Sequence, residues 1–68
     1  MIRATPECVG KLVATTRGWG HCNIIEGDIG RIIEIRDFID IQEIVTQMVE
    51  SHDTFYFQPG DLRGYNGD

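Results

Sequence analysis

Cysteine and histidine side chains are the groups of this chain with the most distinctive chemistry. Cys8, His21, Cys22 and His52 are four side chains of the kind that bind zinc. Their spacing, C-x12-H-C-x29-H, contains no C-x2-C or H-x3-H pair, and the adjacent His21 and Cys22 would point in opposite directions in an extended chain. The pattern therefore favours small buried cysteines and surface histidines over a metal site, with a Cys8–Cys22 disulfide as an alternative.

Two carboxylates, Asp53 and Asp61, are of the type used in acid–base catalysis. No nucleophile–base set accompanies them. The segment Gly27-Asp28-Ile29-Gly30 lacks the Lys-Ser/Thr of a phosphate-binding loop. A barrel of this size would also have an interior filled by side chains, without a substrate cavity. We therefore predict a protein that is not an enzyme, with no catalytic residues and no cofactor.

Trp19 lies between Gly18 and Gly20 in an expected loop over 17–23. A large aromatic side chain on such a loop can be the buried anchor of a protein interface. It can equally fold back and cover one end of the domain, with its indole N–H bonded locally. Both interpretations stay open at the level of the sequence.

Six carboxylates occur within eighteen residues, accompanied by Arg31 and Arg36. The six are Glu26, Asp28, Glu34, Asp37, Asp40 and Glu43. They form either a negative face that docks on a basic protein surface or a solvated edge that keeps a small domain soluble.

The 68 residues, 41% of them apolar, are sufficient for one small domain over 1–68. Six Lys/Arg against eleven Asp/Glu give a net charge of −5, which disfavours general binding to nucleic acid. The basic residues are scattered: Arg3, Lys11, Arg17, Arg31, Arg36 and Arg63. The chain has no bilayer-length apolar run, no secretory run in MIRATPECVGKL, and only two cysteines, so we expect a cytoplasmic protein with reduced thiols and no membrane contact.

Ten Ile, four Val and five Thr against two Ala favour strands over helices. Strands are expected over 10–16, 29–35 and 54–58, with Ile33 and Ile35 sharing one face and Ile32 with Glu34 the other. Pro59-Gly60 should end the last of these, followed by one short turn over 60–63.

The segment 41–49 allows two structures. Apolar positions 41, 44, 45, 48 and 49 follow a helical stripe. Five of its nine residues are β-branched, however, and a bulge or a strand buried on both faces would explain the adjacent apolar pairs. We predict a strand, with a helix over 41–50 on a small antiparallel sheet as the alternative.

The order Glu26-Gly27-Asp28-Ile29-Gly30-x-Ile32, a further strand, and Thr54-Phe55-Tyr56-Phe57-x-Pro59-x-Asp61-Leu62 resembles small SH3-like β-barrels. These include KOW-like domains and the short barrels common among bacteriophage and bacterial proteins. The resemblance covers residues 9–63. It implies an all-β, five-stranded SH3-like barrel and does not extend to the tryptophan pair of peptide-binding SH3 domains, since no tryptophan lies near residue 41.

The predicted core consists of Val9, Leu12, Ile29, Ile33, Ile35, Val45, Phe55, Phe57 and Leu62. The predicted partner-binding residues are Arg17, Trp19, His21, Glu26, Asp28, Glu34, Asp37, Asp40, Tyr56 and Tyr65. The predicted function is a protein-interaction module, such as a phage-type inhibitor or modulator of a host protein, acting on a basic partner surface. The alternatives are a KOW-like nucleic-acid-binding barrel using Lys11, Arg17 and Arg31, or a structural subunit that oligomerises through edge strands.

Overall fold

The computed structural model describes residues 4–65, which form five antiparallel strands in a single sheet. The strands are β1 (Leu12–Thr15), β2 (Ile29–Asp37), β3 (Gln42–Met48), β4 (Thr54–Phe57) and β5 (Leu62–Gly64). One-turn 3-10 helices, η1 (Pro6–Cys8), η2 (Gly20–Cys22) and η3 (Pro59–Asp61), lie in the connections. The predicted all-β class is confirmed, and the alternative helix over 41–50 is wrong because Gln42–Met48 is a strand.

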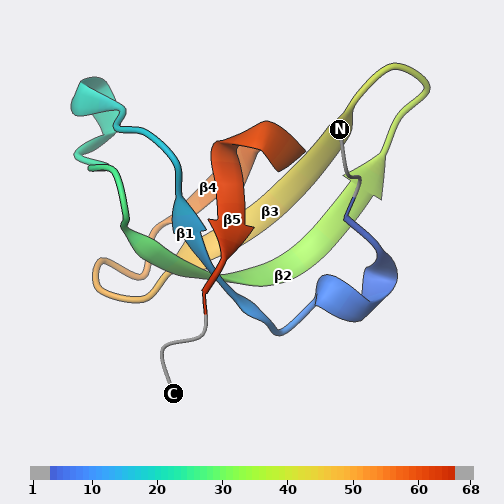
Figure 1. Cartoon of the computed structure of the whole chain (residues 1–68), viewed down its shortest axis with the longest axis horizontal. Coiled ribbons are helices and arrows are strands. Elements are labelled where there is room, and N and C mark those ends of the chain that lie inside the picture. The colour runs from blue at the N-terminus through green and yellow to red at the C-terminus, as the bar shows by residue number, and fades with distance from the viewer. Residues whose placement is uncertain (1–3, 66–68) are drawn as a thin grey trace.

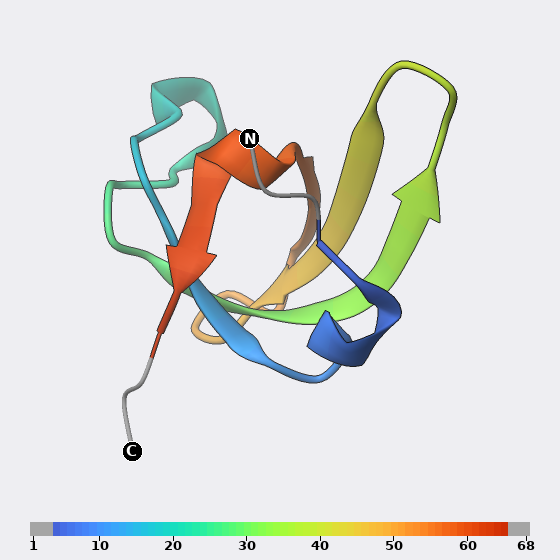
Figure 2. The same ribbon diagram turned by 45° about the vertical axis from the view of Figure 1, so that its right-hand side comes forward.

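The sheet has the strand order β4-β3-β2-β1-β5. Strands β1 to β4 follow one another as a meander, and β5 returns to pair with the outer side of β1. The sheet curls strongly, so that η3 connects its two edge strands, β4 and β5, across the open side (Figure 1; Figure 2). The β2–β3 hairpin is the longest pairing and its turn projects beyond the curl (Figure 2).

Two apolar clusters fill the inside of the curl. Val13, Ile32 and Ile44 form the first, and Ile24, Met48 and Phe57 form the second. Leu62 packs against both clusters and so connects them. Of the predicted core, Val45 and Phe57 are buried, and five residues are partly buried: Leu12, Ile29, Ile35, Phe55 and Leu62.

Two predicted core residues, Ile33 and Val9, were wrong, with exposed fractions of 45% and 47%. Ile33 is the extra residue of a β-bulge, because the pairing steps from Ile32 opposite Thr46 directly to Glu34 opposite Val45. The bulge reverses the alternation, so that Ile32 and Ile35 both reach the first cluster. Val9 follows η1 and lies before β1, where no sheet face covers it.

Strand β3 is buried on both faces at its centre, as one of the explanations for its sequence requires. Ile44 and Thr46 point into the curl, and Val45 between them is only 4% exposed. The register places Val45 on the outer face between Glu34 of β2 and Tyr56 of β4. This central strand therefore contributes apolar contacts to both sides of the sheet.

Gly30 provides a test of the packing at the centre of the sheet. It is buried in β2, and a Cβ there would lie 2.5 Å from Thr46 Cγ2 and 3.1 Å from Met48 Sδ. We expect Gly30→Ala to lower the free energy of unfolding by about 1–3 kcal/mol, because the neighbouring side chains must move. Urea denaturation measures this change. Gly64→Ala on β5 is the control, since its Cβ meets no atom within 4 Å, and an equal loss in both variants would contradict this packing.

Candidate protein-interaction surface

Trp19 is partly buried and packs at one end of the sheet. Its ring lies 5.3 Å from the Phe57 ring, tilted by 58°, and it packs against the second apolar cluster. The backbones of Trp19 and Ile24 exchange hydrogen bonds of 2.8 and 3.2 Å, which fold the 17–23 loop over this end of the sheet. Of the two interpretations of Trp19, the structure therefore corresponds to the covering role.

Arg17 contacts this tryptophan and also pairs with η3. The Arg17 guanidinium lies 4.9 Å from the Trp19 ring centroid and 3.4 Å from the Asp61 carboxylate. It thus connects the loop to η3 through a cation–π contact and an exposed ion pair, each of modest strength. His21 is exposed in η2. The carboxylate of Asp61 also accepts a 3.0 Å hydrogen bond from the Gln58 N–H, so it caps η3.

Asp28 has a structural partner within its own turn. Its carboxylate accepts a 3.0 Å hydrogen bond from the Ile25 N–H. The buried Thr15 hydroxyl donates to the Ile25 carbonyl at 2.7 Å and accepts from the Asp28 N–H at 3.0 Å. These bonds hold the turn before β2 in place, and Glu26 at its apex remains exposed.

Arg36 gathers part of the predicted acidic face around itself. It lies 3.3 Å from the Glu34 carboxylate, 3.7 Å from that of Glu43, and 5.4 Å from the Tyr56 ring centroid. The hydrogen bond with Glu34 raises the pKa of Arg36. Arg36 therefore compensates only part of the negative charge of Glu34 and Glu43, which lie with Tyr56 on the outer face of β2, β3 and β4.

The turn between β2 and β3 exposes large apolar side chains. Phe38 is 51% exposed, Ile41 is 46% exposed, and Ile39 is completely exposed. The Phe38 N–H donates to the Ile41 carbonyl at 2.9 Å, which closes the turn. Asp40 lies between the two isoleucines and is exposed. We call residues 38–41 the hairpin tip.

The hairpin tip was missed as a candidate site by the sequence prediction. Turns between paired strands are normally rich in Gly, Asn, Asp, Ser and Pro, whereas Phe38-Ile39-Asp40-Ile41 carries three large apolar residues in four positions. That contrast is the signal that could have identified it. Asp37, next to the tip, accepts a 2.8 Å hydrogen bond from the amide of buried Gln42, which also bonds both backbone groups of Ala4.

A groove open to solvent borders the first apolar cluster. Its volume is about 710 Å³, and it runs between β5 and η1. Its floor includes Leu12, Val13, Ile32, Ile44 and Leu62. The groove is open to solvent, and the side chains of Val13, Ile32 and Ile44 beneath it are only 3–8% exposed.

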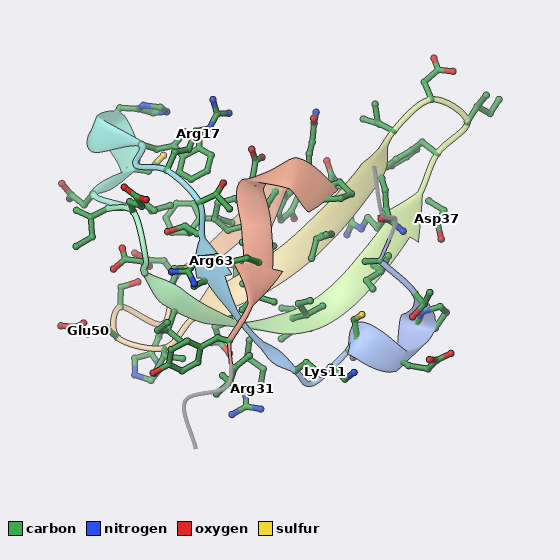
Figure 3. All side chains as sticks on the ribbon, in the orientation of Figure 1. Lys11, Arg17, Arg31, Asp37, Glu50 and Arg63 are labelled. Carbon is green, nitrogen blue, oxygen red and sulfur yellow. The ribbon has the colours of Figure 1, made fainter. Side chains whose placement is uncertain are left out.

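The potential metal ligands and the basic residues are dispersed. Within residues 4–65, no three His, Cys, Asp or Glu side chains come together as a metal site. Cys8 and Cys22 are free thiols that pack against different apolar clusters. Figure 3 shows Arg17 at one end of the molecule and Lys11 and Arg31 at the other, so these three do not share a surface. Tyr65 is 39% exposed after β5.

Comparisons of the chain with protein-family models, with curated proteins and with solved structures give no match in any of the three. Membership of the SH3-like or KOW-like family therefore stays a prediction. In the described part of the chain, no helix has the length and apolar character needed to cross a membrane.

The Thr15 hydroxyl provides a test of the turn that holds Asp28. We expect Thr15→Val to lower the free energy of unfolding by about 1–3 kcal/mol, since the Ile25 carbonyl loses its donor and the Asp28 N–H loses its acceptor, both in part-buried hydrogen bonds, while the shape of the buried side chain is retained. Thr15→Ser, which keeps the hydroxyl, should lose clearly less. Urea denaturation of both variants measures the difference, and a Thr15→Val protein as stable as the wild type would contradict this role.

Trp19 provides a second test, which separates its two interpretations. We expect Trp19→Ala to lower the free energy of unfolding by about 2 kcal/mol, because a partly buried ring leaves the second cluster. Trp19→Phe should retain part of that stability. Unchanged stability of Trp19→Ala together with a lost partner would instead identify Trp19 as an interface anchor.

Proposed function

We propose that this protein is a non-enzymatic interaction module that inserts its hairpin tip into an apolar recess on a protein partner. The complete exposure of Ile39 between half-exposed Phe38 and Ile41 carries the proposal. Apolar side chains exposed together cost solubility and are typical of interaction sites, whereas single ones are ordinary. Burying one isoleucine or phenylalanine side chain contributes about 1.5–3 kcal/mol, so three together can anchor an interface.

The charge around the tip favours a partner with a basic surface. Asp40 lies within the tip, Asp37 precedes it, and the whole chain carries a net charge of −5. Such a field accelerates encounter with a positive surface and disfavours approach to phosphate. With the resemblance to phage-type barrels, the finer proposal is a small inhibitor or modulator of a host protein, acting in a reducing cytoplasm.

The proposed contact differs from the one first predicted. The acidic face and the 17–23 loop were expected to bind the partner, but Trp19 packs inside and Glu34 is paired with Arg36. Asp37 and Asp40 remain beside the proposed contact. The hairpin tip replaces the loop because its three apolar side chains are 46–100% exposed, whereas Trp19 is partly buried.

The experiment is quantitative capture from a bacterial lysate with the purified full chain. We expect a specific protein to be retained by the wild type and recovered at least about tenfold less with Ile39→Ser, since the central apolar contact is lost. Val49→Ser is the matched control, because Val49 is 52% exposed in a different turn and should leave capture unchanged.

Two outcomes would overturn the proposal. One is capture that is equal for the wild type and Ile39→Ser. The other is steep salt-dependent binding of labelled RNA or DNA in titrations at two salt concentrations, which would favour the nucleic-acid-binding alternative.

A further inference from the structure

A second groove lies at the end of β3 that is remote from the hairpin tip. Its volume is about 990 Å³, and it lies between residues 22–29, which lead into β2, and residues 48–55, which form the turn between β3 and β4. The Val49 N–H donates to the Ile29 carbonyl at 3.0 Å and joins the two segments. The tip precedes β3 and this groove follows it, so the two surfaces lie at opposite ends of that strand (Figure 1). We call it the acidic groove.

The acidic groove has apolar side chains that solvent reaches on both of its segments. Ile25 is 68% exposed on the first segment, and Val49 is 52% exposed on the second. Ile29 and Phe55 also line the groove and are partly buried. A bound side chain can therefore cover apolar surface on both sides of the groove.

The charged residues that line this groove are all acidic. They are Asp28, Glu50 and Asp53, and none of the lining residues is Lys, Arg or His. The Asp28 carboxylate accepts a hydrogen bond from the Ile25 N–H, whereas Glu50 and Asp53 are exposed and form no ion pair within residues 4–65. Figure 3 shows Glu50 directed away from the sheet. The groove therefore combines accessible apolar surface with uncompensated negative charge.

An arginine side chain matches both properties of the acidic groove. Its aliphatic stem packs on apolar surface while the charged end remains at the solvent-exposed rim. Its planar guanidinium binds carboxylates through paired hydrogen bonds and is more weakly hydrated than the ammonium of lysine. The net charge of −5 attracts a cationic segment and repels an anionic one.

We infer that the acidic groove binds an arginine-containing segment of another protein. The arginine stem packs on Ile25 and Val49, and the guanidinium binds the carboxylates of Glu50 and Asp53. This site goes beyond the proposed function. The hairpin tip is an apolar element that enters a recess of its partner, whereas the groove is a recess that receives a charged side chain at the other end of the molecule.

The experiment is an NMR titration of the full chain, labelled with ¹⁵N, with a synthetic peptide of alternating leucine and arginine, acetylated and amidated at its ends. We expect saturable shifts of the amide signals of residues 25–29 and 48–53, with a Kd on the order of 0.1–1 mM. The matched probe carries citrulline, which has nearly the shape of arginine but no charge. It should bind about tenfold more weakly, because the charge-assisted hydrogen bonds are lost.

The groove carboxylates are tested by the double variant Glu50→Gln/Asp53→Asn. It should weaken binding of the arginine peptide about tenfold and leave binding of the citrulline peptide nearly unchanged, which a merely structural role of these residues would not produce. The control is Glu7→Gln/Asp40→Asn, which removes the same amount of negative charge from exposed residues outside the groove. It should retain the binding of the wild type to within about twofold.

The apolar side of the groove is tested by Val49→Ser. This variant should weaken binding of both peptides about threefold, since part of the apolar surface is lost. Ile39→Ser is the control here, because it changes the hairpin tip and leaves the groove intact.

Four results would overturn the inference. They are the absence of saturable shifts up to about 5 mM arginine peptide, shifts centred on another part of the molecule, a citrulline peptide that binds as tightly as the arginine peptide, and equal losses in the two double variants. Capture from a lysate that proves independent of Ile39 would overturn the proposed function alone. Peptide binding to the groove does not depend on that residue, so the two failures are distinguishable.

Discussion

One extra residue in β2 determines which side chains line the inside of the sheet. Without the bulge at Ile33, regular alternation would place Glu34 on the same face as Ile32, inside the curl. With it, Ile35 follows Ile32 into the first cluster, Asp37 reaches the amide of Gln42, and Glu34 and Arg36 move outward together. A bulge also bends its strand and increases the local twist. The curl of the sheet and the separation of core from charged patch both follow from this position.

The same bend explains why the molecule has apolar surface at two separate places. The outer half of the β2–β3 hairpin extends beyond the short strands β1 and β5, which pair only with the inner half of β2 or with each other. Its turn therefore has no neighbouring strand to cover Phe38, Ile39 and Ile41. On the inner half, β5 has only three residues and leaves the floor of the groove partly open.

The sequence predicts where the strands lie, but it does not predict which face of the sheet each side chain occupies. The β-branched residues of 41–49 and the alternation of Phe55 with Phe57 correctly predict strands, because local preference and burial agree there. The predicted burial of Ile33 is wrong because one bulged residue reverses the sheet face of every later residue in β2. Whether such a bulge forms depends on the pairing with the partner strand. The hairpin tip was not predicted as a site, because only the fold shows that nothing in the described part of the chain covers its apolar side chains. The contacts of Asp28 and Glu34 could not be predicted either, because their partners, a backbone N–H and Arg36, are only visible in the structure.

Electrostatics makes the tip a selective surface. The net charge of −5 repels one copy from another, and this repulsion acts over about a Debye length, roughly 8 Å at physiological salt. Copies of this chain therefore repel each other at short range. A basic protein surface would meet no such opposition, so charge favours the proposed basic partner at these three apolar side chains.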